Sequence, residues 1–449
     1  SADIERDRGR IFVTSYLLAQ SGGAPFRRPV IFLFNGGPGS SSAWLHIGAF
    51  GPRRLALPQG PTDFGAPPFD LVDNPHTLLD VADLVFIDPI ETGWSTLDVA
   101  DEDNVERWRG RSQDARSVAA TILAWVEKHE RWNAPRYILG ESYGAVRAAT
   151  ILSEISEDWF DLPFNGAILV SSGIGLGDIW SGRDETSNAV ALFPTYAAVA
   201  RFHGKSKPNR KRRSELQSVE DFAVRELPRA ILLGDGLDGA EAAALAGRAE
   251  ALTGLSAGVW RERDFLIDPA TFARSLLADE DKILGRYDAR LIAAAESGIV
   301  DPSNERIVGA FVDGVNYYLR TELSMKRPDR RYELVNESAN FAWEYFSNDP
   351  RGSRSFGNNR AASDLAAAAA RNGDLRVFIA SGLYDLVTPY FGAETALTRA
   401  GMPPERLEMR RYEGGHMMYL NEKALAELSR DIRNFIAARA DAPPRSKSR

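Results

Sequence analysis

A serine at the apex of a glycine-flanked turn is the clearest chemical feature of this sequence. Ser142 lies within Gly140–Gly144 (GESYG), after the apolar run Tyr137–Leu139 and before a helix-forming stretch that begins at Ala145. Glycines two positions to each side permit a strained serine backbone and a close approach of helix to strand. Such a turn presents the hydroxyl at the end of a strand, where a helix N-terminus favours developing negative charge. The pattern predicts a nucleophilic serine.

A nucleophilic serine requires a base, and the base requires an acid that orients it. The chain has five histidines, and His416 stands apart because two glycines precede it, directly after the strand-like run Leu407–Tyr412. A histidine in a simple glycine turn is the alternative interpretation. Three of the others have the setting of surface or structural residues: His76, His129 and His203.

Asp385 is the candidate acid. It follows the strand-like run Leu375–Ala380, and as an isolated residue it could equally be a turn aspartate. In α/β-hydrolases the catalytic residues come in the order Ser, Asp, His, each from a loop after a strand. Ser142, Asp385 and His416 have this order and this placement, so together they predict a catalytic triad.

The glycine-rich stretch Phe34–Ser42 (FNGGPGSSS) is the candidate oxyanion-binding loop. It leaves the strand-like run Pro29–Phe34, and its glycines allow backbone N–H groups to face a ligand. We assign the two oxyanion donors to the N–H groups of Gly37 and Tyr143. A phosphate-binding loop is excluded because the Gly-Lys-Ser/Thr ending is missing.

Alternating strand and helix patterns position these residues and predict an α/β fold with a mostly parallel sheet flanked by helices. Ser112–His129 has helical spacing, and Glu422–Ala438 forms a closing helix. Further strands are expected at Arg10–Leu18, Leu84–Ile87 and Ala167–Val170. No strand–helix alternation is visible between the two halves. The expected organisation is a first core part at 1–176, a mainly helical cap insertion at 177–360, a second core part at 361–440 and a disordered tail at 441–449.

Composition sets broad limits on function. The 449 residues are 44% hydrophobic and 26% charged, with a net charge of −8, so neither nucleic acid nor an anionic membrane is an expected partner. The absence of cysteine excludes disulfides, thiolate metal sites and cysteine nucleophiles. No apolar run is long enough to span a membrane, and we expect no metal and no organic cofactor. The start at Ser1 without an apolar leader fits a removed export signal or a shortened chain, and we expect an exported (periplasmic or secreted) protein.

One basic cluster interrupts the insertion. Lys205–Arg213 (KSKPNRKRR) lacks the interleaved aromatic residues of a nucleic-acid-binding surface. A solvated insertion loop is therefore the favoured interpretation, and a binding role is the alternative.

Several motifs together resemble the serine carboxypeptidases, a family of acid exopeptidases with the α/β-hydrolase fold, and in particular their bacterial branch. The matching segments occur in the order of the family and span nearly the whole chain: NGGPGSSS at 35–42, DPIETGWS at 88–95, GESYG at 140–144, SGLYDLVTP at 381–389 and EGGHMMY at 413–419. The resemblance also implies an inserted helical cap.

The resemblance further implies a site for the terminal carboxylate of the substrate. Asn35, Gly36 and Glu141 match the positions that hold this carboxylate, and Met417 matches a position beside the leaving-group pocket. Glu141 can help only when it is protonated, because two nearby carboxylates repel each other, so acidic pH should favour binding. A structural hydrogen bond beneath the turn is the alternative role for Glu141, and simple packing is the alternative for Met417.

Two positions depart from the family pattern. Ala49 stands where a second glutamate is common, and Glu91 stands where a glycine is usual. Loss of the second acid bears directly on carboxylate recognition. Arg53 or Arg54 could supply a cationic partner instead, although both could also be surface residues.

The sequence thus predicts a serine carboxypeptidase that hydrolyses the C-terminal peptide bond of peptides or proteins through an acyl-enzyme on Ser142. An esterase or acyltransferase on the same scaffold is the second hypothesis, because the triad forms an acyl-enzyme whatever nucleophile arrives next. A catalytically silent binding protein is the third. The sequence does not indicate the oligomeric state.

Overall fold

The computed structural model describes most of the chain. The described residues are 8–18, 27–58, 63–98, 105–155, 162–175, 185–206, 212–325, 330–344, 347–348, 354–355 and 359–440. Three expectations from the sequence fall wholly or partly outside these ranges: the tail at 441–449, the middle of the basic cluster at 207–211 and the boundary near residue 177.

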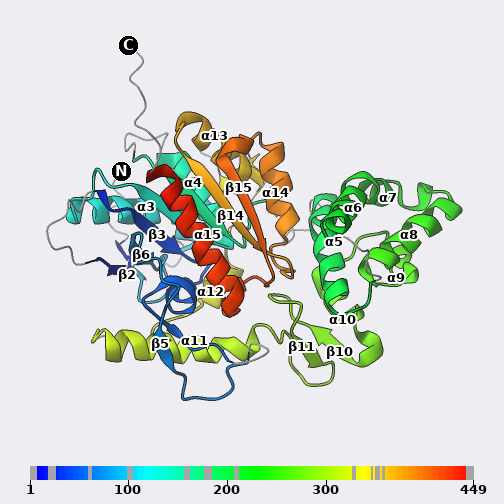
Figure 1. The fold of residues 1–449 in the computed structure, drawn as a ribbon, viewed down its shortest axis with the longest axis horizontal. Helices are drawn as coiled ribbons and strands as arrows, with labels where there is room; N and C mark the ends of the chain where they lie inside the picture. The colour runs from blue at the N-terminus through cyan, green and yellow to red at the C-terminus, as the bar shows by residue number, and fades with distance from the viewer. Residues whose placement is uncertain are drawn as a thin grey trace, which may run out of the picture.

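A seven-stranded sheet in the order β15-β14-β9-β8-β3-β6-β2 forms the centre of the molecule (Figure 1). Its strands are β2 (Val13–Tyr16), β3 (Val30–Phe34), β6 (Asp83–Ile87), β8 (Arg136–Glu141), β9 (Gly166–Val170), β14 (Arg376–Gly382) and β15 (Leu407–Tyr412). All neighbouring strands are parallel except β2, which pairs antiparallel with β6 at one edge. The expected mostly parallel sheet is therefore confirmed.

Alternate residues of the strands fill two separate cores, one on each face of the sheet. Phe32 and Ile138 point into the core covered by α3 (Arg111–Lys128), α4 (Tyr143–Ile155) and α13 (Asn359–Arg371). Leu33 and Leu139, one residue further along, point into the core covered by α15 (Glu422–Ala440). In Figure 1 the red α15 lies in front of the sheet. Continuous apolar strands are required because both faces are buried.

The segment between β9 and β14 contains a group of helices with a hydrophobic core of its own. These helices are α5 (Glu185–Phe202), α6 (Arg212–Arg225), α7 (Leu227–Leu233), α8 (Gly239–Thr253), α9 (Ala257–Glu262) and α10 (Pro269–Ser275). Figure 1 shows them in green beside the sheet. Leu383, Tyr384 and Leu386, which flank Asp385, also belong to this core. The helices therefore pack directly on the loop that carries the candidate acid.

The mainly helical middle segment also contains two pairs of short strands. β10 (Lys282–Leu284) pairs with β11 (Ile292–Ala294), and β12 (Ser347–Asn348) pairs with β13 (Arg354–Ser355), both antiparallel. Strands of two or three residues are too short to give a period-2 signal, so the sequence pattern did not reveal them. Two further helices follow the first pair: α11 (Glu305–Tyr317) and α12 (Glu337–Phe341).

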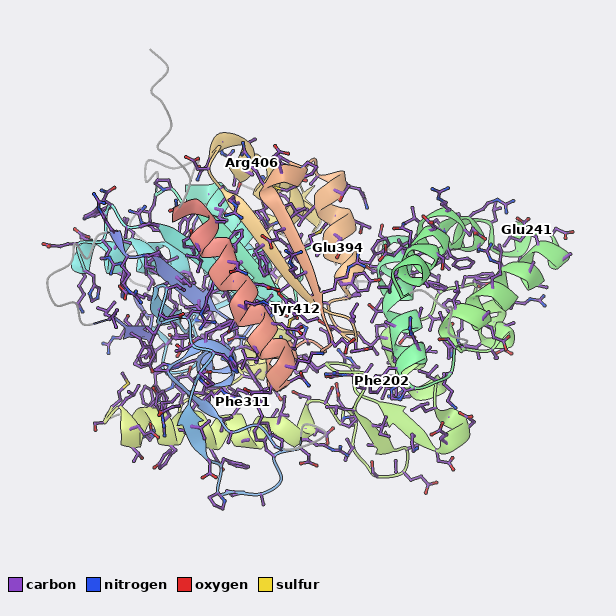
Figure 2. The ribbon with its side chains drawn as sticks, viewed as in Figure 1. Phe202, Glu241, Phe311, Glu394, Arg406 and Tyr412 are labelled. Carbon is purple, nitrogen blue, oxygen red and sulfur yellow. The ribbon has the colours of Figure 1, made fainter. Side chains whose placement is uncertain are left out.

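Polar contacts also join α6 to the sheet. Arg411 of β15 forms ion pairs with Glu220 of α6 at 2.7 Å and with Glu394 of α14 (Tyr390–Arg399) at 2.5 Å. The labelled Glu394 in Figure 2 lies on the side of α14 that faces the green helices. The helical segment is thus attached to the sheet by charge as well as by apolar contact.

Short elements complete the described chain. They are α1 (Ala43–Leu45), α2 (Val105–Trp108), the pair β1 (Arg8–Arg10) with β7 (Thr96–Asp98), the pair β4 (Arg53–Leu55) with β5 (Leu71–Asp73), the π-helical turns His46–Phe50 and Tyr318–Glu322, and the 3₁₀ turns Gly234–Gly236, Ala278–Glu280, Pro404–Arg406 and Met418–Leu420. In the part of the chain that is described, no helix combines the length and apolarity needed to cross a membrane.

Candidate active site

Ser142 occupies the sharp turn between β8 and α4, as the glycine spacing predicts. Its φ is +59°, a left-handed conformation that is strained for a residue with a side chain. A Cβ at Gly140 would lie 2.2 Å from the Gly144 carbonyl oxygen, so only glycine allows the turn to close. Ser142 N donates to the Val170 carbonyl at 3.0 Å, which fixes the turn to the end of β9.

Asp385 and His416 form the expected acid–base pair. His416 Nδ1 lies 2.8 Å from Asp385 Oδ2, and both residues are buried. Asp385 Oδ1 accepts from the backbone N–H groups of Val387 and Thr388 at 2.8 and 2.9 Å. Thr388 Oγ1 donates to Asp385 Oδ2 at 2.5 Å. These bonds hold the carboxylate and thereby orient the imidazole, and the sequence did not identify Thr388 as a member of the site.

Electrostatics favour a charged imidazole in this pair. Burial lowers the pKa of His416, but the charge and hydrogen bond of Asp385, together with the charge of Glu141, outweigh burial, so the pKa lies above its usual value. A histidine of this kind accepts a proton readily, which suits a general base.

Ser171 connects the histidine loop to the serine turn. Its hydroxyl donates to the His416 carbonyl at 2.5 Å, while the residue before it, Val170, accepts the N–H of Ser142. The three candidate triad residues therefore follow the carboxyl ends of β8, β14 and β15, and Ser171 follows β9, the strand between β8 and β14. Within the described residues, Ser142 Oγ makes no hydrogen bond to His416. Such a bond is often long in the absence of substrate and shortens when substrate is present.

The candidate oxyanion loop packs against the serine turn with no room for side chains. A Cβ at Gly36 would lie 2.5 Å from Tyr143 N and 2.7 Å from Gly144 N. Gly37 has φ +96°, a conformation that favours glycine. The two proposed donors, Gly37 and Tyr143, are thus brought to neighbouring segments of backbone.

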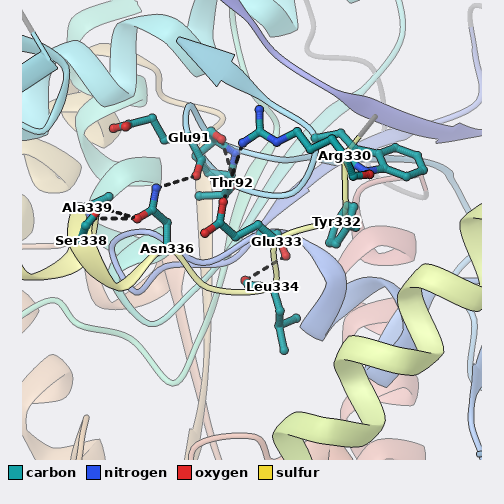
Figure 3. A network of polar contacts seen from close by, with 12 residues as sticks. Glu91, Thr92, Arg330, Tyr332, Glu333, Leu334, Asn336, Ser338 and Ala339 are labelled. Atoms are coloured by element: carbon teal, nitrogen blue, oxygen red, sulfur yellow. Dashed lines mark hydrogen bonds and ion pairs between the residues drawn. The ribbon is translucent and has the colours of Figure 1, made fainter. Parts of the chain in front are cut away.

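The stretch 332–340 crosses this loop on its outer side. Asn336 N donates to the Gly39 carbonyl at 2.8 Å, and Asn340 Nδ2 donates to the Pro38 carbonyl at 2.7 Å. Figure 3 shows the side chain of Asn336 between Ala339 N and the carbonyl of Glu91. Glu91 has φ +64° and pairs with Arg109 through two bonds of 2.9 Å. The usual glycine of this motif would adopt this conformation without strain. Glu91 adopts it although it carries a side chain.

Asp88 connects the glycine-rich loop to the stretch 332–340. Its Oδ1 accepts from Ser42 N at 2.9 Å, from Ser42 Oγ at 2.7 Å and from the Tyr332 hydroxyl at 2.8 Å. Burial raises its pKa to about 6, and these hydrogen bonds oppose the rise. Asp88 therefore holds the carboxyl end of the loop in place.

Glu141 lies directly before the serine and is fully enclosed by polar partners. Asn35 Nδ2 donates to its Oε2 at 2.5 Å, and the Tyr419 hydroxyl lies 3.0 Å from each carboxyl oxygen. Burial raises its pKa to about 7, which the nearby His416 and these hydrogen bonds only partly counteract. The resemblance named Asn35 and Glu141 as residues of one carboxylate site, and the structure brings the two side chains together. Tyr419, which lies 278 positions from Glu141, was not identified from the sequence.

Other candidate residues have simpler surroundings. Met417 packs against both the core under α15 and the core beside α11, so its apolar side chain has a structural role. Ala49 is buried and offers no acid to Glu141. Of the two arginines that could replace this acid, Arg53 pairs with Asp73 and Glu322, and the buried Arg54 pairs with Glu422. A role for either in carboxylate recognition stays a prediction.

The remaining histidines have structural partners. His46 Nε2 lies 2.7 Å from the Tyr16 hydroxyl, and its ring stacks on Phe86. Burial lowers the pKa of His46 to about 3. The other three make these contacts: His76 with Glu422, His203 with the Ala289 carbonyl and His129 with the Trp125 ring. Within the described residues, no group of three or more acidic or histidine side chains could hold a metal ion.

The hairpin loop 285–290, between β10 and β11, holds both the acid loop and the base loop. Leu386 N donates to the Arg286 carbonyl at 3.0 Å, and His416 N donates to the Tyr287 carbonyl at 2.5 Å. Arg290 Nη1 donates to the Glu413 carbonyl at 2.9 Å. The Tyr287 ring meets His416 edge-on at 5.3 Å. No motif in the sequence indicated this contact.

Comparisons with known proteins agree with this geometry. Residues 10–202, which include Ser142 and the glycine-rich loop, match the family model described as serine carboxypeptidase. Serine carboxypeptidase-like 20 from Arabidopsis thaliana is 28% identical over 142 residues, a match that covers 31% of this chain and 27% of that relative. The matched region thus spans about a quarter of the length of that relative.

A solved structure shares the fold. The crystal structure of Kex1(Δ)p, a prohormone-processing carboxypeptidase from Saccharomyces cerevisiae, superposes with a TM-score of 0.58 at 15% identity, covering 96% of this chain and 86% of the other. At this level of identity the similarity establishes the α/β-hydrolase architecture and no more.

Proposed function

We propose that this chain is a serine carboxypeptidase, because residues 10–202 match that family, and that it hydrolyses the C-terminal peptide bond of peptides or proteins. The observation that carries the proposal is the buried acid Glu141 beside the nucleophile, held by Asn35 and Tyr419. A buried carboxyl at this place is unnecessary for acyl transfer as such. It is useful where the substrate carries its own carboxylate next to the scissile bond.

The triad residues supply the chemistry in this proposal. Ser142 Oγ attacks the last peptide carbonyl while His416 Nε2 takes its proton, and Asp385 stabilises the imidazolium through Nδ1. The N–H groups of Gly37 and Tyr143 stabilise the oxyanion. His416 then gives the proton to the departing amino group, and the C-terminal amino acid leaves. Water, activated by His416, hydrolyses the resulting ester and restores Ser142.

Protonated Glu141 selects a free C-terminus in this proposal. Below its pKa of about 7 the carboxyl is neutral and can donate a hydrogen bond to the terminal carboxylate of the substrate. Above that pH two carboxylates would face each other in a buried site, which is unfavourable. Gly36 and Asn35 complete the site on the loop side, and Met417 borders the leaving group.

A pair of matched peptides tests the proposal. One has a free C-terminus, and the other is identical but amidated. Release of the last residue from the free peptide only, and its loss in Ser142→Ala, is the expected result. Equal turnover of both peptides would overturn the exopeptidase assignment in favour of an esterase or acyltransferase. Failure of Ser142 to react with a fluorophosphonate would instead support the silent binding protein.

We also propose that the protein works outside the cytoplasm. The support is chemical, because a carboxylate site that is neutral below about pH 7 works best in a mildly acidic compartment. Fractionation of cells that express the full-length protein tests this, and recovery of all activity in the cytoplasmic fraction would contradict it.

A further inference from the structure

Arg147 is a completely buried cation on α4, five residues after Ser142. Its Nε donates to Asp114 Oδ2 at 2.6 Å, and its Nη1 donates to the Asn35 carbonyl at 2.5 Å. The guanidinium carbon lies 5.4 Å from the ring centroids of both Phe34 and Tyr143. One side chain therefore contacts the end of β3, the start of the glycine-rich loop and the residue after the nucleophile.

Stability alone does not explain this arrangement. Desolvating a guanidinium and a carboxylate is costly, and a buried ion pair is often no more stabilising than apolar residues of similar volume. Asp114 is itself 3% exposed, burial raises its pKa, and Arg147 opposes that rise. Arg147 Nη2 is buried without a hydrogen-bond partner. An apolar residue could fill the same space between α3 and α4.

What an apolar residue could not do is hold a backbone carbonyl. The Asn35 carbonyl belongs to the peptide group that joins Asn35 to Gly36, and Gly36 packs directly on Tyr143 N. Fixing this carbonyl fixes the orientation of the peptide plane before Gly36. The next N–H along the chain is that of Gly37, the proposed oxyanion donor.

We propose that Arg147, anchored by Asp114, is a positioning residue for the oxyanion hole: it sets the placement of the Gly37 N–H relative to the Tyr143 N–H. The inference rests on the proposed acyl-transfer chemistry at Ser142, and it holds for any acyl donor. Oxyanion donors must lie within a few tenths of an ångström of their best position to be effective, so a shift of this loop lowers the acylation rate without weakening substrate binding.

The chain offers a matched control. Arg111 is also buried on this face of the sheet, where it bonds to Thr150 and Asp364, and it makes no hydrogen bond to the glycine-rich loop. Arg147→Met and Arg111→Met should therefore destabilise the protein similarly, and only the first should disturb the loop.

The test measures thermal stability, the rate of Ser142 labelling by a fluorophosphonate, and kcat and KM on a free C-terminal peptide. Arg147→Met should lower the labelling rate and kcat about 100-fold with KM nearly unchanged, by analogy with loss of one oxyanion donor. Arg111→Met should label as wild type. Equal labelling rates in these two variants would overturn the proposal.

Two further variants keep the test decisive if Arg147→Met fails to fold. Arg147→Lys retains the cation beside Asp114, and Asp114→Asn retains the shape of the anchor. Each should lose labelling rate by about tenfold while remaining folded, because the carbonyl contact is weakened rather than removed. Wild-type labelling in both would refute the positioning role. Labelling that follows these expectations without release of C-terminal residues would retain the positioning role and reject the carboxypeptidase assignment.

Discussion

The two halves of the site are held in position in different ways. On the serine side, the start of the glycine-rich loop is held by buried side chains between the sheet and its helices: Arg147 donates to the Asn35 carbonyl and is itself paired with Asp114. On the histidine side, the loops of Asp385 and His416 are also bonded through their backbone to the hairpin loop 285–290, by Leu386 N and His416 N.

This difference separates fixed from adjustable parts of the site. The serine side shares its packing with the sheet, so disturbing it should cost global stability. The histidine side depends on a segment that lies between β9 and β14 and whose helices have a hydrophobic core of their own. Displacing that segment should impair the base while the sheet remains folded.

Removing the chemical groups themselves gives the largest effect and should not distinguish the two sides. Ser142→Ala and His416→Ala should each lower kcat/KM by roughly 10⁴- to 10⁶-fold, and the double variant should be no worse than either, because the groups act as a unit. Steady-state kinetics on a free C-terminal peptide measures this, with circular dichroism to confirm folding. Substantial activity in Ser142→Ala would remove it as the nucleophile.

Adding a single methyl group on each side should reveal the difference. A Cβ at Gly36 would meet Tyr143 N at 2.5 Å, and one at Gly415 would meet the Tyr287 carbonyl oxygen at 2.2 Å. Both changes should lower kcat about 100-fold through misplacement. Gly36→Ala should also cost about 3 kcal/mol of unfolding free energy, and Gly415→Ala closer to 1 kcal/mol, because its neighbour can move.

Denaturant unfolding of both glycine variants measures that difference in stability. Gly309→Ala on α11, where an added Cβ meets nothing within 4 Å, is the control. Equal stability losses at Gly36 and Gly415 would show that the histidine side is as rigidly built as the serine side.

The pH dependence of KM tests Glu141, which lies between the two halves. Its pKa is raised to about 7, so the carboxyl is neutral at lower pH and becomes charged as pH rises through that value. KM for a free C-terminal peptide should therefore stay flat below pH 7 and be about tenfold higher at pH 8. Glu141→Gln, which cannot ionise, should abolish the rise. A peptide ester without a terminal carboxylate should show no rise, and an identical rise for that ester would rule out repulsion as its cause.

The smallest effect is expected at Arg290, which is partly exposed and fastens the base loop through one hydrogen bond and a contact with the Tyr384 ring. Arg290→Met should cost about 1 kcal/mol of unfolding free energy and lower kcat a few-fold. Thermal denaturation and kinetics measure both quantities, with the exposed Arg261→Met as control. A kcat loss as large as that of Gly415→Ala would mean that this side chain, rather than the backbone contacts, holds the loop.

The sequence was informative where function depends on local order. Ser142, Asp385 and His416 could be predicted because each follows a strand-like run and lies among glycines with steric reasons to be there. The seven strands of the sheet were also predicted, with shifts at their ends. The five central strands are recognisable because buried parallel strands are largely continuous apolar runs.

Contacts between distant segments could not be predicted in this way. Tyr419 bonds to Glu141 across 278 positions, and Arg147 reaches Asn35 across 112, so neither pairing leaves a spacing in the sequence. Thr388 lies within the matching segment SGLYDLVTP, but its residue type alone indicated no role in the site. The hairpin loop 285–290 lies between strands of three residues, which carry no periodicity. The division into core and insertion at residues 177 and 360 stays a prediction.

The hairpin loop 285–290 has a consequence for protein engineering. The helical segment has a hydrophobic core of its own, so it could be exchanged as a unit between related proteins. In this protein the same segment also supports the base, so an exchanged segment without a matching hairpin loop would leave the histidine misplaced. A successful chimera would graft the helices at α5–α10 and keep residues 282–294 from the host.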